Sequence, residues 1–429
     1  MNIKNPKLQK WITLLAVAFT GGVINKICYL RETYYDPLQQ ATGATDVQLG
    51  LLMSAFGIAN FIFYFPGGVL ADKFSSKKLI IFSCFSTAIA GFWYSTLPSF
   101  QVLMLLHVVF AVTTVFTFWA AMVKIVNNLG GAEEQGKLMG SLEAFRGLFG
   151  TIAAFVSVYF FSRAGEGIAG LQATVQFYSV VLIIAGTCAA IFIKEPECMK
   201  IERDARAKEK KVKEKVNWGD VLAVIKMPRI WLAGILVLMS YSALIFHGMV
   251  TPYMTAAFGL SGSVVAMLST VRTYVMMMIG AMIAGILADK MGSVVKFMKY
   301  GFFGMAIFAA GYLLIPANRD LVWLIVLNFI FYGMCLYSVK ALYFATIDEC
   351  LVPKHLAGTA SGIISLIGYC PEIFMYVWVG NIVASGEGLS GYHTIFKFMI
   401  GFAVVGVVCA ALLMHLIKKA KAEGAVEEV

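Results

Sequence analysis

Three arginines lie inside long apolar stretches of this 429-residue chain: Arg31, Arg146 and Arg272. A charged side chain is costly in hydrocarbon, so a charge in such a stretch marks a candidate functional site. The planar guanidinium group can donate two parallel hydrogen bonds to a phosphate, sulfonate or carboxylate group. The acidic residues nearby are too few to pair all three arginines, so the sequence predicts a binding site for a small organic anion.

Helix geometry indicates how deep these arginines would lie in a membrane. Arg146 lies ten residues into its apolar stretch, about 15 Å, close to the middle of a hydrocarbon core roughly 30 Å thick. Arg272 lies seventeen residues before Asp289, about 25 Å from the end of its stretch. Both are too deep for the side chain to reach the lipid headgroups easily. Lys124 lies near the end of its stretch, where a long stem is expected to reach them.

Arg31 belongs to a crowded stretch that also holds Lys26 and two acidic residues. Lys26 and Arg31 are five residues apart, about 140° around a helix, so they cannot both face one central path. We expect Arg31 to line the path, with Tyr34 and Tyr35 stacked one turn further on. Lys26 is expected to pair with an acid elsewhere.

Acidic residues and histidines in the apolar stretches could carry protons. Glu143 and Arg146 are three residues apart and share a helix face. Either they simply neutralise each other, or Glu143 takes a proton when an anion binds Arg146. Glu372, His107 and His247 are further candidates, although a buried histidine is more often a packed and hydrogen-bonded residue.

The composition is that of an integral membrane protein. Apolar residues make up 60% of the chain and charged residues only 14%, with a mean hydropathy of +0.80, which excludes a water-soluble globule. Thr45 or Asp46 is expected to cap the second stretch, with Gln48 in its first turn. Twelve helices of spanning length are predicted, at about residues 11–40, 47–70, 78–97, 99–126, 136–161, 171–193, 229–257, 263–287, 294–316, 320–347, 356–383 and 391–417.

One sequence motif occurs twice, as GVLADK at residues 68–73 and as GILADK at residues 285–290, so that the second copy begins 217 positions after the first. Each copy follows a long apolar stretch and is followed by further lysines. A repeat of this period indicates two homologous halves. We therefore expect six-helix halves at residues 1–193 and 229–429, joined by a polar segment at residues 194–228.

This repeated motif resembles the loop between helices 2 and 3 of major facilitator superfamily transporters. The resemblance implies an all-α integral membrane protein with twelve helices in two pseudo-symmetric six-helix halves, which rock to give alternating access. In that family the loop docks on helix 11 in one copy and on helix 5 in the other. Ser75 and Ser76 stand where the family has glycine and arginine. The expected gating residues are Gly68, Asp72, Lys73, Lys77, Gly285, Asp289 and Lys290.

A second stretch, at residues 352–362, resembles the entry to helix 11 of organophosphate:phosphate antiporters. Those antiporters carry an arginine on helix 1 in the substrate path, and Arg31 occupies the similar place. They pair it with an arginine on helix 7, where this chain has only His247. Either Arg272 on helix 8 substitutes for it, or the substrate is a carboxylate or a sulfonate.

Lysine and arginine are concentrated in alternate loops, which predicts that both termini are cytoplasmic and that the protein lies in a bacterial inner membrane. The net charge of +10 is distributed between apolar stretches and does not form a nucleic-acid-binding patch. Eight single cysteines without metal-ligand spacing indicate neither a disulfide framework nor a metal site. We expect no cofactor, and a monomer whose partners are the lipid bilayer and a small organic anion.

These features together predict a secondary transporter that moves a small organic anion by exchange or by proton coupling. A proton-coupled sugar or polyol symporter is the alternative, and it would use Glu143, Glu372 and the tyrosines. A membrane sensor of the same fold, which binds a ligand without transporting it, is a further alternative. No catalytic signature is found in the sequence, so an enzyme is not expected.

Overall fold

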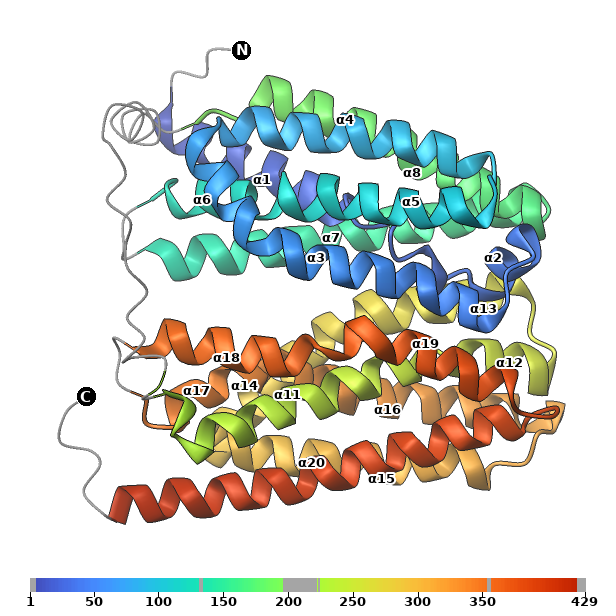
Figure 1. Ribbon diagram of the computed structural model, residues 1–429, viewed down its shortest axis with the longest axis vertical. Helices are drawn as coiled ribbons and strands as arrows, with labels where there is room; N and C mark the ends of the chain where they lie inside the picture. Colours follow the sequence, from blue (N-terminus) through green and yellow to red (C-terminus); the bar gives the residue numbers. More distant parts are fainter. Residues whose placement is uncertain (1–4, 131–133, 196–221, 223, 353–355, 423–429) are drawn as a thin grey trace. The chain divides into compact units, whose positions relative to one another are not determined.

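The computed structural model describes residues 5–130, 134–195, 222, 224–352 and 356–422 (Figure 1). Within these ranges the chain is helical and contains no β-strand. The chain forms two compact units. Met1–Lys213 and Gly262–Thr270 make up the first, and Glu214–Ser261 and Val271–Val429 make up the second. The boundary therefore passes through the eighth of the twelve expected helices.

The helices of the first unit follow the predicted stretches closely, and two of these stretches are interrupted. They are α1 Pro6–Val23, η1 Leu30–Glu32, α2 Tyr35–Thr42, α3 Asp46–Lys73, α4 Ser76–Ser95, α5 Phe100–Ala111, the π segment Val112–Phe116, α6 Trp119–Asn127, α7 Gln135–Arg163, α8 Gly167–Phe192 and α13 Gly262–Thr270.

The second unit contains more interruptions, in the seventh, eighth, tenth and eleventh expected helices. Its elements are α11 Pro228–His247, α12 Val250–Phe258, the π segment Val271–Met276, α14 Met277–Met291, α15 Val294–Leu314, η5 Arg319–Leu321, α16 Val322–Leu342, η6 Tyr343–Ala345, α17 Thr346–Glu349, α18 Ala357–Tyr369, α19 Pro371–Ala384 and α20 Ser390–Ala422.

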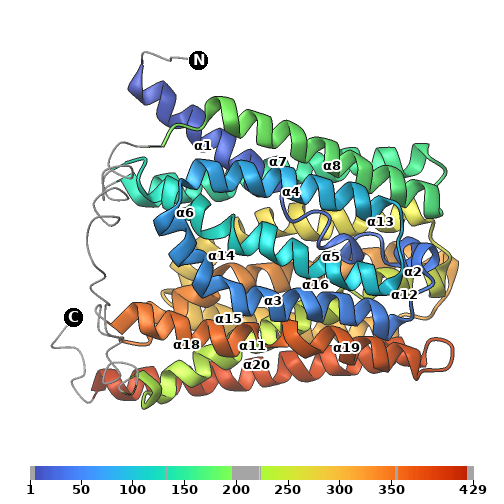
Figure 2. The same ribbon diagram turned by 45° about the horizontal axis from the view of Figure 1, so that its top comes forward.

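The two units repeat one packing scheme, as Figures 1 and 2 show. In the first unit α1 packs on α7 and α8, and α4 packs on α8. In the second unit α11 packs on α18 and α20, and α15 packs on α20. These are equivalent helices in the two halves of the sequence. The predicted pseudo-symmetry is therefore confirmed.

Eleven stretches of the described chain are long and apolar enough to cross a membrane. The first expected helix does not count among them because its regular part ends at Val23. The prediction of one helix over residues 11–40 was therefore wrong. Residues 24–34 form turns and a short 3-10 segment. This irregular backbone lets Lys26 and Arg31 both be buried, with 8% and 3% of their surfaces exposed, although on a regular helix they would point about 140° apart.

The start of α3 agrees with the sequence analysis. Thr45 is the N-cap, its hydroxyl oxygen accepts from the backbone N–H of Gln48, and the Gln48 side chain accepts from the backbone N–H of Thr45. This reciprocal pair is a capping box, which satisfies two of the backbone donors that a helix start leaves open. The choice between Thr45 and Asp46 is therefore settled in favour of Thr45.

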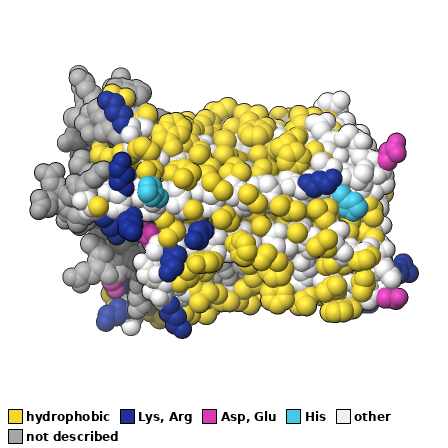
Figure 3. All heavy atoms as spheres, turned by 90° about the horizontal axis from the view of Figure 1, so that it is seen from below, with side chains coloured by type: hydrophobic (Ala, Val, Ile, Leu, Met, Phe, Trp, Pro, Cys, Tyr) yellow, Lys and Arg dark blue, Asp and Glu magenta, His cyan; other side chains and the backbone are white. Residues whose placement is uncertain are grey.

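One face of the molecule shows the surface expected in lipid. A wide apolar band covers its middle, and most of its lysine and arginine side chains gather at one end (Figure 3). A soluble protein rarely exposes so large an apolar area. Exposed apolar side chains on α15 and α20 are Tyr300, Phe303, Ile307, Leu314, Val404, Val405, Val408 and Leu412.

Candidate functional site

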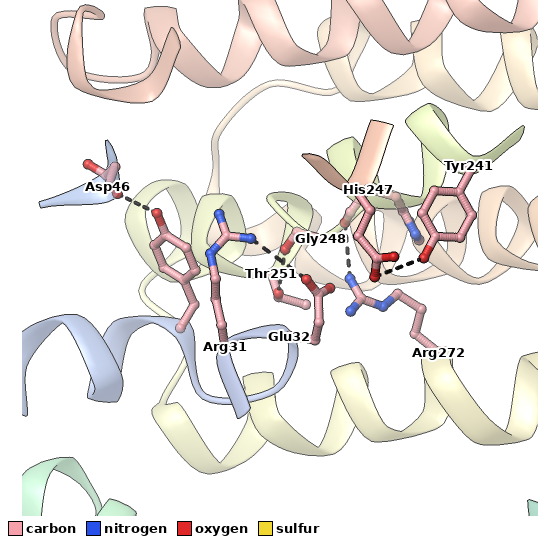
Figure 4. A network of polar contacts seen from close by, with 10 residues as sticks. Arg31, Glu32, Asp46, Tyr241, His247, Gly248, Thr251 and Arg272 are labelled. Atoms are coloured by element: carbon pink, nitrogen blue, oxygen red, sulfur yellow. Dashed lines mark hydrogen bonds and ion pairs between the residues drawn. The ribbon is translucent and has the colours of Figure 1, made fainter. Parts of the chain in front are cut away.

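Arg31 lies in the break of the first membrane helix, within η1. Its Nη1 atom is 3.7 Å from Oε1 of Glu32, and its guanidinium carbon lies 4.9 Å from the centre of the Tyr35 ring. Tyr35 is itself fixed, because its hydroxyl donates a 2.5 Å hydrogen bond to Oδ1 of Asp46 (Figure 4). The break therefore holds a buried guanidinium group against an anchored aromatic ring.

Tyr34 belongs to a different network from Tyr35. Its hydroxyl is 2.9 Å from the hydroxyl of Ser157 on α7, which also accepts a 2.7 Å hydrogen bond from Tyr178 on α8. The Tyr34 ring packs on Phe161, with 4.9 Å between ring centres. Tyr34 thus ties the broken stretch to α7 and α8, whereas the ring against Arg31 is that of Tyr35.

Lys26 lies in the same break and reaches α7. Its Nζ atom donates a 2.7 Å hydrogen bond to the carbonyl oxygen of Gly150. From the sequence, an acidic partner was expected for this lysine. The partner identified here is a backbone carbonyl four residues after Arg146 on the same helix.

Arg146 is held on α7 by three neighbours. Its Nη1 atom donates a 2.5 Å hydrogen bond to Oε1 of Glu143, and its guanidinium carbon lies 5.1 Å from the centre of the Trp119 ring. A Cβ atom placed on Gly21 of α1 would lie 2.8 Å from Nε of Arg146, so the glycine makes room for this side chain. The Arg146 side chain is 16% exposed, and its Nε has no hydrogen-bond partner among the described residues.

Arg272 lies in the π segment of the eighth helix and is 2% exposed. Its Nη1 atom donates a 3.2 Å hydrogen bond to the carbonyl oxygen of His247, the last residue of α11 (Figure 4). The chain then turns at Gly248 before α12 begins, and the hydroxyl of Thr251 donates to the Gly248 carbonyl at 3.1 Å. Arg272 therefore places its guanidinium group at the break of the seventh helix. Single π turns of this kind are frequent at functional sites.

His247 is completely buried in an aromatic cluster. Its ring centre lies 4.6 Å from that of Tyr332 and 5.0 Å from that of Phe329, and its Nε2 is 3.3 Å from the hydroxyl of Tyr312. His107 in the first unit is also buried, with its Nδ1 2.8 Å from the carbonyl oxygen of Leu103 in its own helix.

Glu372 lies at the break of the eleventh helix, in the first turn of α19 after Pro371. The hydroxyl of Tyr241 donates a 3.3 Å hydrogen bond to Oε1 of Glu372, and the Tyr241 ring contacts that of Tyr369 edge-on, with 5.1 Å between ring centres. The hydroxyl of Tyr369 is 2.8 Å from that of Tyr343. The second unit thus contains a carboxylate bordered by tyrosines.

In the first copy of the repeated motif, Asp72 pairs with a cation within its own unit. Nζ of Lys124 on α6 lies 2.7 Å from Oδ1 of Asp72 and 3.2 Å from the carbonyl oxygen of Ala71. Lys124, which was expected to reach the lipid headgroups, therefore holds the end of α3. Lys73 and Asp289 are exposed, as is Lys290, whereas Lys77 is partly buried.

The motif glycines, which were expected among the gating residues, lie in open space. A Cβ atom on Gly68 or on Gly285 would meet no atom within 4 Å. The neighbouring Gly67 does, because its Cβ would lie 2.9 Å from the carbonyl oxygen of Phe116 in the π segment of the fourth helix. Helices 5 and 11, on which the resemblance implies that the loops dock, start at about residues 135 and 356, at the edge of the described chain. Lys354 and His355 lie outside the described chain, as does most of the segment at residues 194–228.

The helix that follows each motif copy is capped by one glutamate, and neither glutamate was predicted from the sequence. Oε1 of Glu195 accepts from the Ser75 hydroxyl at 2.8 Å and from the backbone N–H of Lys77 at 3.0 Å. Glu349 accepts from the Ser293 hydroxyl at 2.8 Å and from the backbone N–H of Val294. They lie after the sixth and the tenth helix, which are not equivalent positions. Comparison of the two repeats therefore could not have found them.

Comparison with known proteins identifies the family of the chain. Residues 14–375 match the Major Facilitator Superfamily, and the chain belongs to that family. It is thus a multi-pass membrane transporter and not an enzyme.

Two similar proteins come from Escherichia coli strain K12. The inner membrane protein YqcE is 28% identical over 404 residues, which cover 93% of both chains. The inner membrane protein YihN is 27% identical over 417 residues, which cover 97% of this chain and 98% of YihN.

Two solved structures share the fold. The nucleoside transporter NupG, in a mutant form, has a TM-score of 0.70 at 15% identity and covers 95% of this chain and 100% of its own. A bacterial homologue of the human lysosomal transporter Spinster, inward-facing and unoccupied, has a TM-score of 0.68 at 13% identity and covers 97% of this chain and 98% of its own.

Proposed function

We propose that the protein carries a small organic anion across a bacterial inner membrane by alternating access between its two halves. The anion bears a phosphate, sulfonate or carboxylate group. One observation carries the proposal: each unit buries one guanidinium group at the break of its first helix. In the first unit it is that of Arg31, and in the second unit it is that of Arg272.

The two breaks are equivalent in the sequence repeat. Gly248 lies 217 positions after Arg31, the same spacing that separates Asp72 from Asp289. The second half has no arginine at the equivalent position of its own first helix, and Arg272 reaches that break from the next membrane helix. This supports the substitution of Arg272 for the helix 7 arginine of organophosphate antiporters.

Arginine is suited to this task because its planar group donates in a fixed fork and remains charged. Burying such a group is expensive, and a bound anion offsets part of that cost. Broken helices in transporters commonly surround the substrate near the middle of the membrane. We propose that Arg146 makes a third cationic contact with the anion. The Tyr35 ring would form the aromatic wall of the site beside Arg31.

A proton-coupled polyol symporter is the second candidate, and the pair of Tyr241 and Glu372 favours it. A carboxylate and tyrosine hydroxyls can exchange hydrogen bonds with sugar hydroxyls. Glu372 and His247 would then be the groups that carry the proton. This candidate requires no anionic group on the substrate, and that difference separates the two proposals.

Matched ligand pairs test the proposal with the purified protein. Glycerol 3-phosphate would be compared with glycerol, glucose 6-phosphate with glucose, and gluconate with glucose, by following the melting temperature in detergent. A ligand that binds the native state stabilises it by mass action. We expect at least one anion to raise the melting temperature while its neutral partner has no effect. Stabilisation by the neutral member of each pair would favour the polyol symporter.

A further inference from the structure

Glu166, between the fifth and the sixth membrane helix, has a backbone conformation that is rare for a residue with a side chain. Its φ is 57° and its ψ is −159°, and it lies between Gly165 at φ 90° and Gly167 at φ 52°. This conformation is almost confined to glycine, and another residue adopts it only where the surrounding structure holds it there. Contacts of Glu166 are therefore expected to hold this strained backbone.

The Glu166 side chain contacts the start of α13. Its Oε1 atom accepts a 2.6 Å hydrogen bond from the hydroxyl of Ser263. A Cβ atom on Gly262 would lie 3.1 Å from Oε2 of Glu166 and 3.3 Å from the ring of Phe161 on α7. Glu166 belongs to the first half of the sequence repeat and α13 to the second half. This contact therefore fastens a piece of the second half within the first unit.

The eighth membrane helix changes its packing partners along its length. Its first part, α13, packs on α7, whereas the π segment packs on α16 and α14 packs on α15 and α16. The packing of α14 is close, because a Cβ atom on Gly280 would lie 3.1 Å from the backbone nitrogen of Ser338. The Ser338 hydroxyl also donates a 3.1 Å hydrogen bond to the Gly280 carbonyl. The helix is thus anchored to α7 at its start and to α16 further on.

Arg272 lies between these two anchors. It is the second residue of the π segment, is 2% exposed, and donates to the carbonyl oxygen of His247 (Figure 4). The π segment joins α13 directly to α14. A displacement of α13 relative to α14 must be absorbed in the segment that joins them. Release of α13 from α7 would therefore move the Arg272 guanidinium group.

We propose that Glu166 and Ser263 form a latch that closes one end of the transporter and opens once in each transport cycle. In the closed latch, the carboxylate holds α13 on α7. When the latch opens, α13 moves with α14, and Glu166 relaxes to an ordinary backbone conformation. This inference rests on the proposed alternating access and adds the residue that controls one side of it.

The latch is distinct from the gating residues expected in the repeated motif. Asp72 of that motif pairs with Lys124 of α6, close to the loop that leads into α7. Glu166 follows the other end of α7, which has 29 residues and is about 43 Å long. The loop charges predict that the end with Glu166 faces outside.

A reversible cross-link between positions 166 and 263 tests whether the latch must open. Glu166→Cys and Ser263→Cys would be combined in a variant without the eight native cysteines, and joined with a short, reducible thiol cross-linker. We expect exchange of the best panel anion in proteoliposomes to fall at least about tenfold and to recover after reduction. Ser95→Cys with Gln172→Cys is the control pair, because the Gln172 amide donates to the Ser95 carbonyl between two helices of the first half. That cross-link should leave exchange unchanged.

Labelling of a buried thiol tests the latch without any substrate. Ser269→Cys places the thiol on α13, at a position that is 0% exposed. Glu166→Ala keeps the strained backbone and removes the carboxylate, so α13 should open more often. A water-soluble thiol reagent should then label position 269 about tenfold faster. Ser179→Cys on α8, which is equally buried, should be labelled at one rate with and without Glu166→Ala.

Unchanged exchange in the protein cross-linked between positions 166 and 263 would overturn the latch and leave anion transport standing. An equal labelling rate at position 269 with and without Glu166→Ala would also overturn the latch. Failure of the wild type to exchange any panel anion would overturn the anion transport, and labelling at position 269 would then decide on the latch alone.

Discussion

Arg272 donates a hydrogen bond to the carbonyl oxygen of His247, although the two residues belong to different membrane helices. His247 ends α11, and the last carbonyl groups of a helix lack partners within that helix and carry a partial negative charge. A guanidinium group supplies a hydrogen bond to such a carbonyl and a positive charge beside it, and it uses only one of its five donors to do so. The bond therefore positions Arg272 at the break of the seventh helix, which is the geometry that the anion proposal requires.

Gly21→Ala should weaken anion binding although the glycine carries no functional group. The new methyl group would lie 2.8 Å from Nε of Arg146 and 2.9 Å from Sδ of Met122, so Arg146 must move. We expect the dissociation constant for the best panel anion to rise about tenfold or more, which corresponds to a loss of about 1.4 kcal/mol of binding free energy. Gly140→Ala is the matched control, because its methyl group would meet nothing within 4 Å. Equal effects of both changes would contradict this role of Gly21.

Asp72→Asn should slow transport more than it weakens binding. The change removes the charge that pairs with Lys124, and both side chains are partly exposed, so the cost in stability should stay below about 1 kcal/mol. Exchange rates and half-saturation constants in proteoliposomes would separate the two effects. The double variant with Asp72→Asn and Lys124→Gln should exchange substrate no more slowly than the slower of the two single variants, because the two residues act as one pair. Additive losses would show that the residues work independently.

Glu349→Gln should lower thermal stability. The carboxylate accepts hydrogen bonds at the start of α15 from Ser293 and Val294, and a charged cap at a helix start contributes about 1–2 kcal/mol. We expect a fall of several degrees in the melting temperature of the purified protein. Glu387→Gln, at an exposed position of the loop before α20, should leave the melting temperature unchanged. No difference between these two variants would argue against the cap.

The orientation in the membrane can be measured with single cysteines in a variant that lacks the eight native ones. Lys78→Cys and Ala164→Cys are both exposed positions, at opposite ends of their membrane helices. The loop charges predict that an impermeant thiol reagent labels position 78 only from the cytoplasmic side and position 164 only from outside. Labelling of position 78 from outside would invert the topology.

The sequence predicted the helices well because apolar length and a repeated motif are local signals. Eleven of the twelve stretches, the pseudo-symmetry and the Thr45 cap need no knowledge of distant contacts. The break after Val23 was missed because Ile24, Ile27 and Leu30 continue the apolar pattern between the charged residues there. Only the tertiary partners of Lys26 and Tyr34 on α7 reveal that this stretch is not a regular helix.

The candidate site was harder to predict than the helices. The deep arginines were identified only from the free-energy cost of placing a charge in hydrocarbon. That cost does not indicate which residues each arginine contacts. The pairing of Lys124 with Asp72 and the contact of Arg272 with the seventh helix both join residues on different helices. Neither follows from spacing along one helix. The same holds for Trp119, whose ring supports Arg146 from the fourth membrane helix.

Exchange in proteoliposomes with Arg31→Lys and Arg272→Lys tests the central claim most directly. Lysine keeps the charge but cannot donate two parallel hydrogen bonds to the anion. Disrupting a buried, hydrogen-bonded charge pair costs about 2–5 kcal/mol of binding free energy. We predict that both variants reach the membrane and lose exchange of the best panel anion, whereas Arg163→Lys, at an exposed helix end, exchanges at the wild-type rate. Wild-type exchange in both Arg31→Lys and Arg272→Lys would contradict the anion site.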